Sequence, residues 1–226
     1  MKEGNVKTSK RYITLVAVIV LLLFAVSAFF YPQLPDKLAS HWNAAGQADG
    51  YSSKFWGLFM LPIIAAVLTL FLLLIPRLDP LKANIEKFKG YYYGFIIVFL
   101  LFFFYLHLLT IVYNLGYAFN MTMFLMPAFS VLFYYLGVMV SKAKRNYFIG
   151  IRTPWTLSGD SVWDRTHKLG GKLFKIASII TLLGVLLWQY AIWFMLVPIS
   201  LVAIITVVYS YLVFRKEAKT NAPVQP

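Results

Sequence analysis

Six apolar runs, each long enough to cross a bilayer as a helix, constrain the fold of this 226-residue chain more than any other feature. About 20 apolar residues span the hydrocarbon core as a helix, and no backbone polar group can stay unpaired there. Only 13% of the residues are charged, against about 25% in soluble domains. We therefore expect an all-α polytopic membrane protein with six transmembrane helices, at residues 13–30, 55–75, 91–113, 119–140, 173–190 and 192–214.

The basic residues are sorted strongly to one side of the expected membrane. Of the 21 Lys and Arg residues, only Lys37 and Lys54 fall in connectors on the other side. Because cytoplasmic loops carry the excess of Lys and Arg, we expect cytoplasmic N and C termini. This sorting explains the net charge of +13, so we expect no direct nucleic acid binding.

The first apolar run also has features of a signal peptide. Basic residues precede it, and Val26-Ser27-Ala28 is similar to a cleavage site. The run is longer than the 7–15 apolar residues of a signal peptide, and it continues through Tyr31. We therefore expect it to be retained as the first span.

Two connectors are large enough to form a working surface. The outer one, residues 31–54, is rich in Pro, Gly, Asn and Asp, which favours an ordered turn structure. The inner one, residues 141–175, is a large basic loop in which Ser161 is expected to start an amphipathic helix. That helix would lie in the membrane plane and end before Gly170-Gly171. The expected segments are residues 1–75 with the first two spans, 76–140 with spans three and four, 141–214 with the inner loop and last two spans, and a cytoplasmic tail at 215–226.

The sequence contains none of the common catalytic motifs. There is no His-Glu-x-x-His pattern, no Gly-x-Ser-x-Gly elbow, no Walker loop and no Cys. We therefore expect no enzymatic activity, no cofactor and no metal site. His107 is the one ionisable side chain expected inside a span, either bonded to a neighbouring helix or facing a ligand. Lys175 lies within one turn of its span's start, so its ammonium is expected to reach the headgroups.

The outer connector resembles the DUF1648 module. It carries Tyr31-Pro-Gln-Leu-Pro-Asp, then His41-Trp42-Asn43, then Gly46, Asp49-Gly50-Tyr51 and Lys54. Its ring, amide and imidazole groups suit either a peptide-binding lip or a turn that rests on the bilayer. The outer toxin-facing candidates are His41, Trp42, Asn43, Gly46, Gly50 and Lys54.

The inner connector resembles the SdpI-type immunity proteins of Gram-positive bacteria. The motif is Tyr147-Phe-Ile-Gly-Ile-Arg-Thr-Pro-Trp-Thr156, followed by Val162-Trp163 and Thr166-His167-Lys168-Leu169-Gly170-Gly171. The inner signature candidates are Gly150, Ile151, Arg152, Thr153, Pro154, Trp155, Thr156, Trp163, Thr166, His167, Gly170 and Gly171.

This resemblance implies a multi-pass plasma membrane protein that protects its cell from a secreted antimicrobial peptide, the toxin of a sporulation-delaying, sibling-killing system. It also implies a signalling role, in which the membrane protein holds a small DNA-binding autorepressor at the membrane when the toxin is present. The expected partners are therefore the lipid bilayer, a secreted peptide toxin and a cytosolic transcriptional repressor.

Two other functions remain compatible with the sequence. Six spans suit a small-molecule or peptide transporter, although the spans carry almost no ionisable groups and no inverted repeat is evident. An enzyme acting on a lipid or peptide at the inner face would use Arg152, Asp160, Asp164 and His167. Asp164 and His167 are three residues apart, a spacing that an acid–base pair can use on one helix face.

Overall fold

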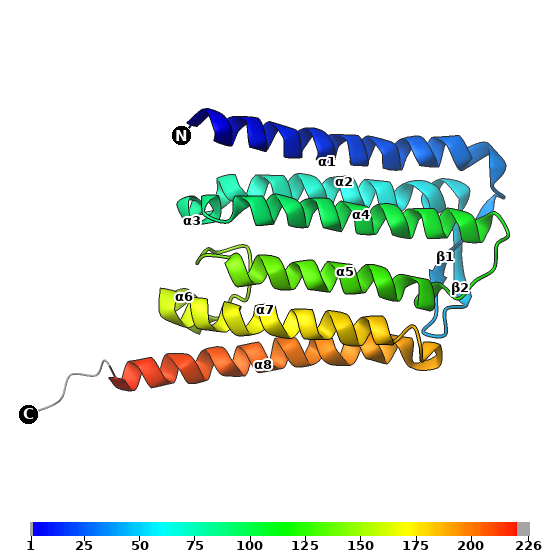
Figure 1. Cartoon of the computed structure of the whole chain (residues 1–226). Coiled ribbons are helices and arrows are strands. Elements are labelled where there is room, and N and C mark those ends of the chain that lie inside the picture. Colours follow the sequence, from blue (N-terminus) through cyan, green and yellow to red (C-terminus); the bar gives the residue numbers. More distant parts are fainter. Residues whose placement is uncertain (1, 221–226) are drawn as a thin grey trace, which may run out of the picture.

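The computed structural model describes the backbone of residues 2–220 and the side chains of residues 10–220. The described chain is mostly helical, and its long helices run side by side (Figure 1). The long helices are α1 (Lys2–Phe30), α2 (Lys54–Leu78), α4 (Lys89–Asn114), α5 (Met121–Lys142), α7 (Asp160–Leu183) and α8 (Ala191–Thr220). The short elements are η1 (Tyr31–Gln33), β1 (Lys37–Trp42), β2 (Ala48–Ser53), α3 (Lys82–Glu86), α6 (Pro154–Ser158) and η2 (Trp188–Tyr190).

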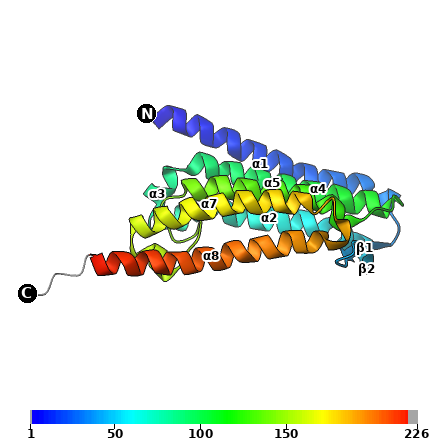
Figure 2. The same ribbon diagram turned by 60° about the horizontal axis from the view of Figure 1, so that its bottom comes forward.

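The long helices form two groups of three. Helices α1, α2 and α4 pack against one another, and α5, α7 and α8 do the same. The contact between α4 and α5 joins the groups. Figure 2 shows the bundle from another side, with α1 and α8 at its two edges. The start of α1 and the end of α8 lie at the end of the bundle opposite the β strands (Figure 1). We call the end with the strands the outer end and the opposite end the inner end.

Five segments are long and apolar enough to cross a membrane, namely Lys10–Gln33, Lys54–Leu78, Lys89–Asn114, Met121–Lys142 and Trp188–Thr220. Four of the six expected spans lie within them, and the expected span at residues 119–140 overlaps Met121–Lys142. The expected fifth span, at residues 173–190, is not among them. Its residues belong to α7, whose first half is charged, and to the turns after Leu183.

The inner connector is more helical than expected. The predicted in-plane helix is wrong, because α7 continues without a break through Gly170 and Gly171 to Leu183. The predicted cap is also wrong, because Gly159 is the N-cap residue and Ser161 lies inside the helix. A Cβ on Gly171 would lie 2.7 Å from the carbonyl oxygen of Gly137. These glycines therefore allow α7 to approach α5 closely instead of ending the helix.

The outer connector contains the only strands in the described chain, so the protein is not entirely α-helical. Strands β1 and β2 form an antiparallel hairpin with Lys37 opposite Ser53 and Ala39 opposite Tyr51. Leu38 is fully buried and packs with Leu34 of the same connector, Leu58 of α2 and Ile111 of α4. The expected ordered turn structure of this connector is therefore confirmed in the form of a hairpin.

Candidate functional site

Two asparagines anchor the hairpin to the ends of the helices. The Asn114 side chain, at the end of α4, accepts from the Ala39 amide at 2.8 Å and donates to its carbonyl at 3.0 Å. Asn120 caps α5 by accepting from the Met123 amide, and its amide group donates to the Ala45 carbonyl at 2.8 Å. The hairpin is thus held to both helix groups, which fixes its position above the bundle.

The outer motif residues hold the hairpin and its turn together. His41 Nδ1 and Asp49 Oδ1 are 2.5 Å apart on the exposed face. Asn43 accepts from the Gln47 amide at 3.0 Å, which closes the turn between the strands. Gly46 has φ +77°, and a Cβ there would collide with Asn120. Glycine is required at this turn on both counts.

The remaining outer motif residues pack within the hairpin or against the helices. A Cβ on Gly50 would lie 2.8 Å from the His41 Cβ, so the strands are tightly apposed there. Lys54 forms an ion pair of 3.2 Å with Asp36 and lies 5.5 Å above the Tyr31 ring centroid. These contacts stabilise the junction between β2 and α2. The contacts of Gly46, Gly50 and Lys54 are therefore those of residues that shape and hold the hairpin.

Trp42 lies at the edge of a cavity beneath the hairpin. Its ring packs edge-to-face on Tyr113, with centroids 5.4 Å apart. Its buried Nε1–H has no hydrogen-bond partner among the described residues. A buried donor without a partner costs about 1–3 kcal/mol, so an acceptor supplied by a ligand would be favourable at this position.

The cavity has a volume of about 540 Å³ and lies between the two helix groups at the outer end. Residues from the hairpin, α2, α4, α5 and the start of α8 line it. Four of the seven methionines of the chain are among the lining residues: Met60, Met121, Met126 and Met195. The polar groups His41, Trp42, Asn43 and Thr122 also line it. The cavity therefore combines an apolar, adaptable wall with a few polar groups from the hairpin, as small binding sites usually do.

His107 lies in the first helix group and does not line this cavity. It is fully buried, and its Nε2 is 2.9 Å from Ser27 Oγ, which also contacts the Leu58 carbonyl at 2.9 Å. The Ser27 hydroxyl also lies 3.1 Å from the Leu23 carbonyl; because carbonyls only accept, its one proton is donated to the Leu23 and Leu58 carbonyls and the hydroxyl accepts from His107. This polar link joins α1, α2 and α4, so the structure favours the interhelical role that the sequence left open.

The inner loop, residues 143–153, is ordered by two buried polar side chains. Asn146 donates to the carbonyls of Lys144 and Ile149, and its Oδ1 accepts from the amides of Phe148 and Ile149. Asp79, at the end of α2, accepts from the Tyr147 amide at 2.8 Å. The loop is therefore closed on itself by Asn146 and tied to the first helix group by Asp79.

The His167 ring forms the centre of the inner signature. Its Nε2 accepts from the Ile151 amide at 3.0 Å, so its Nδ1 carries the proton and donates to the Trp163 carbonyl at 2.9 Å. The ring stacks on Trp163 with centroids 3.9 Å apart. Burial lowers the pKa of His167 to about 4, against the weaker effects of that carbonyl and of Asp164. Gly150 has φ +114°, and a Cβ there would collide with Nε2.

The second part of the inner signature is a capping box that touches α8. The Thr156 amide donates to Thr153 Oγ1 at 3.1 Å, and the Thr153 amide donates to Thr156 Oγ1 at 2.9 Å. Thr153 Oγ1 also lies 3.0 Å from Ser210 Oγ on α8. Trp155 packs on Tyr211, with ring centroids 5.1 Å apart. Pro154 occupies the first turn of α6, where its missing amide proton is harmless.

Three further signature residues lie on the faces of α7 that contact its neighbours. Gly171 meets α5, and a Cβ on Gly170 would collide with Ile151 of the inner loop. Thr166 is fully buried, and its hydroxyl has no partner among the described residues. Arg152 is exposed, and its guanidinium donates to the Tyr147 carbonyl at 2.7 Å. Of the signature side chains, Arg152 is thus the one whose charge remains available to a partner.

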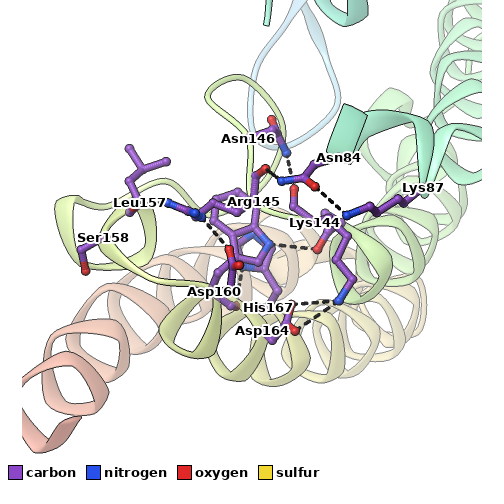
Figure 3. A network of polar contacts seen from close by, with 12 residues as sticks. Asn84, Lys87, Lys144, Arg145, Asn146, Leu157, Ser158, Asp160, Asp164 and His167 are labelled. Carbon is purple, nitrogen blue, oxygen red and sulfur yellow. Dashed lines mark hydrogen bonds and ion pairs between the residues drawn. The ribbon is translucent and has the colours of Figure 1, made fainter. Parts of the chain in front are cut away.

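A charged cleft of about 180 Å³ lies beside the signature at the inner face. Lys144 contacts both Asp164 oxygens at 3.2 Å, and Arg145 Nε donates to Asp160 at 2.6 Å (Figure 3). His167 makes its bonds to backbone groups on the buried side of the helix. The residues that an enzyme would use are therefore engaged separately and do not form an acid–base pair.

Sequence reasoning missed several residues that order these surfaces. Asn120, directly before an apolar run, has the position of a helix N-cap, so a signal was present. Asp79, Asn114 and Asn146 lie at helix ends or in a connector, where their long-range partners cannot be read from spacing. The methionine-lined cavity also left no signal, because its residues come from several helices.

Comparison with known proteins agrees with both resemblances. Residues 18–66 match a family described as "Domain of unknown function (DUF1648)", and residues 142–211 match the SdpI/YfhL protein family. The chain is therefore similar to both families over these segments. It is 27% identical to the Immunity protein SdpI of Bacillus subtilis (strain 168) over 202 residues, which are 88% of this chain and 94% of that protein. No solved structure matches the chain. Its apolar helices and this similarity identify a multi-pass plasma membrane protein.

Proposed function

We propose that this protein protects its cell from a secreted antimicrobial peptide by binding that peptide in the outer cavity. The methionine-lined cavity beneath the hairpin carries the proposal. Its volume of about 540 Å³ suits one or two large apolar side chains, and methionine adapts to irregular partners. The similarity to a protein named as an immunity protein supports the same function.

The position of the cavity favours capture at the outer surface. A toxin that arrives from outside meets the hairpin first, and His41, Trp42 and Asn43 lie where the hairpin faces the cavity. An apolar side chain of the peptide would enter between α2 and α5, and a peptide carbonyl would accept from Trp42 Nε1. Binding at this point keeps the toxin from the rest of the membrane.

A filled cavity tests this function. In Leu125→Trp a larger ring occupies the cavity from α5, whereas Val67→Trp, on the exposed face of α2, leaves the cavity empty. Each variant is expressed at a matched membrane level in a sensitive Gram-positive host without its own immunity genes. The cells are then challenged with the purified sibling-killing peptide toxin, and toxin binding is measured on the purified protein.

We expect the wild type and Val67→Trp to protect the cells and Leu125→Trp to lose both protection and toxin binding. Equal protection by all three forms would show that the cavity is not the toxin site. Failure of the wild type to protect would refute the immunity function for this toxin. Export of the toxin from wild-type proteoliposomes along an imposed gradient would instead favour a transporter.

We propose a second role in sensing, in which the bound toxin changes the inner loop and so the retention of a cytosolic repressor. Such coupling requires two conformations that bind the toxin unequally. The exposed guanidinium of Arg152 is the proposed contact for the cytosolic partner. An Arg152→Ala form that still protects but no longer holds a repressor at the membrane would support this role, and unchanged retention would refute it.

We propose that α7 is a sixth membrane crossing, so that both termini face the cytoplasm. Asp160 pairs with Arg145 at the inner end, and Thr181 Oγ1 donates to the Phe194 carbonyl near the start of α8. The chain has no Cys, so single cysteines report topology directly. Gln189→Cys in intact cells should react with a membrane-impermeant maleimide, and Ser158→Cys only after lysis. The reverse labelling pattern would refute this topology.

A further inference from the structure

The exposed face of α7 changes from cationic to apolar along one stripe. The stripe consists of Lys168, Lys172, Ile176, Ile179 and Leu183. At 100° per residue these five side chains fall within an arc of about 80°. The buried residues of α7, including Trp163, Gly170 and Ala177, lie on the opposite side of the helix. One face of α7 therefore packs in the bundle, and the stripe faces outward.

The two lysines of the stripe are without an acidic partner. Neither Lys168 nor Lys172 has an ion pair or a hydrogen bond among the side chains that the structure describes. The neighbouring acids are already engaged, Asp164 by Lys144 and Glu217 by Ser161 and Arg165. The positive charge of the stripe is thus available to an external anion.

With α7 as the proposed sixth crossing, these lysines lie at the inner boundary of the bilayer. Gly171, between them, packs against Gly137 and Ser141, and Lys142 ends α5 one residue later. Farther along the stripe, Ile176, Ile179 and Leu183 are 53%, 60% and 48% exposed, as side chains that face lipid tails are. Lysine stems can run along the helix and raise the ammonium groups to headgroup level.

We infer that this stripe binds an anionic phospholipid of the inner leaflet. Lys168 and Lys172 are about 6 Å apart along the helix, which lets both ammonium groups contact one headgroup phosphate. From Lys172 to Leu183 the helix rises about 16 Å, close to one half of a hydrocarbon core of about 30 Å. The acyl chains lie along the three apolar residues. On this stripe the two lysines are followed directly by exposed apolar side chains. A phospholipid matches both parts with its headgroup and its acyl chains, whereas an acidic protein surface would match only the lysines.

The test uses the full chain in nanodiscs of phosphatidylcholine that contain a small fraction of labelled phosphatidylglycerol. Enrichment of phosphatidylglycerol at the protein is compared for the wild type, Lys168→Gln/Lys172→Gln and a control, Lys82→Gln/Lys87→Gln. The control removes the same charge from exposed inner-face residues on and beside α3. Thermal unfolding of each form verifies that it is folded.

Each lysine near the surface is expected to contribute about a fivefold preference for anionic lipid. The stripe variant should therefore lose most of the enrichment, whereas the control should retain it. Excess inorganic phosphate should not displace the lipid, because the acyl contacts contribute to binding. Equal enrichment in both variants would assign the effect to the general positive charge of the inner face and overturn the site. Absence of enrichment in the wild type, or full displacement by phosphate, would overturn it as well.

Discussion

Replacing Asn146 by alanine should destabilise the protein more than any other single loss of a polar side chain in the inner loop. The fully buried Asn146 side chain makes four hydrogen bonds, two to carbonyls and two from amides. Each net bond contributes about 1 kcal/mol, and backbone groups left without partners cost about 1–3 kcal/mol each. Allowing water to reach part of this loop, we expect a loss of about 3–4 kcal/mol.

The matched control is Asn84→Ala, in the same inner region. Asn84 makes one bond to the Arg145 carbonyl and one from Lys87 at the exposed surface, so about 1 kcal/mol should be lost. Both variants would be unfolded reversibly in mild detergent by titration with sodium dodecyl sulfate, followed by tryptophan fluorescence. A cost for Asn146→Ala no greater than that of Asn84→Ala would refute the reasoning that the four bonds of this side chain are the main closure of the loop.

Three further predictions concern the inner signature and its packing. Because the folded-state pKa of His167 lies at about 4, below the usual value near 6.5, stability from neutral His167 is present above pH 6.5 and lost as the pH falls toward 4. The loss is about 3 kcal/mol. The free energy of chemical unfolding should therefore fall between pH 6.5 and pH 4 in the wild type but not in His167→Gln, and the same pH dependence in both forms would contradict the prediction. Gly150→Ala should cost about 2–3 kcal/mol through its positive φ and its collision with His167. Gly159→Ala has nothing within 4 Å of its Cβ and loses only a preferred N-cap residue of α7, so it should cost less than about 1 kcal/mol. Gly137→Ala should lower the melting temperature by forcing α5 and α7 apart, although alanine favours helices, and Gly90→Ala should raise or maintain it; equal shifts would show that the close approach is not needed.

The sequence was sufficient to predict most helices, and the reasons for its failures are specific. The apolar runs and the sorting of basic residues can each be read within one stretch of sequence, so no knowledge of distant contacts was needed to predict them. The two helical pieces of α7 were expected, but not their continuity, because the first half of this helix mixes charged residues with the buried Trp163 and Gly170. The pair Gly170-Gly171 has the pattern of a helix end, and only the neighbouring helix shows that it marks a close contact.

The sequence predicted which two segments carry the candidate sites, but not the directions and contacts of their side chains. Both connectors with motifs proved to be ordered, and their residues were placed at opposite ends of the bundle as expected. Whether a residue points to a partner or into the fold depends on contacts distant in sequence. The collision of a Cβ at Gly46 with Asn120, for example, joins positions more than 70 residues apart. No periodicity within one segment contains such a contact.

A continuous series of contacts connects the hairpin at the outer end with the inner loop. The proposed sensing role would use this series. The hairpin touches the first residues of α5, because the Gly46 carbonyl accepts from the Met121 amide at 3.2 Å. Near its other end, about 24 Å away along the axis, α5 meets α7 at Gly137 and Gly171 without side chains between the two backbones. A direct backbone contact transmits a shift of α5 that flexible side chains would absorb.

On α7, His167 lies one turn from Gly171 and accepts a hydrogen bond from the Ile151 amide, so a movement of α7 reaches the inner loop through one hydrogen bond. In the proposed sensing role, Gly171 would therefore transmit the movement of α5 to α7. The coupling free energy between toxin and cytosolic partner cannot exceed the free-energy difference of these contacts between the two states.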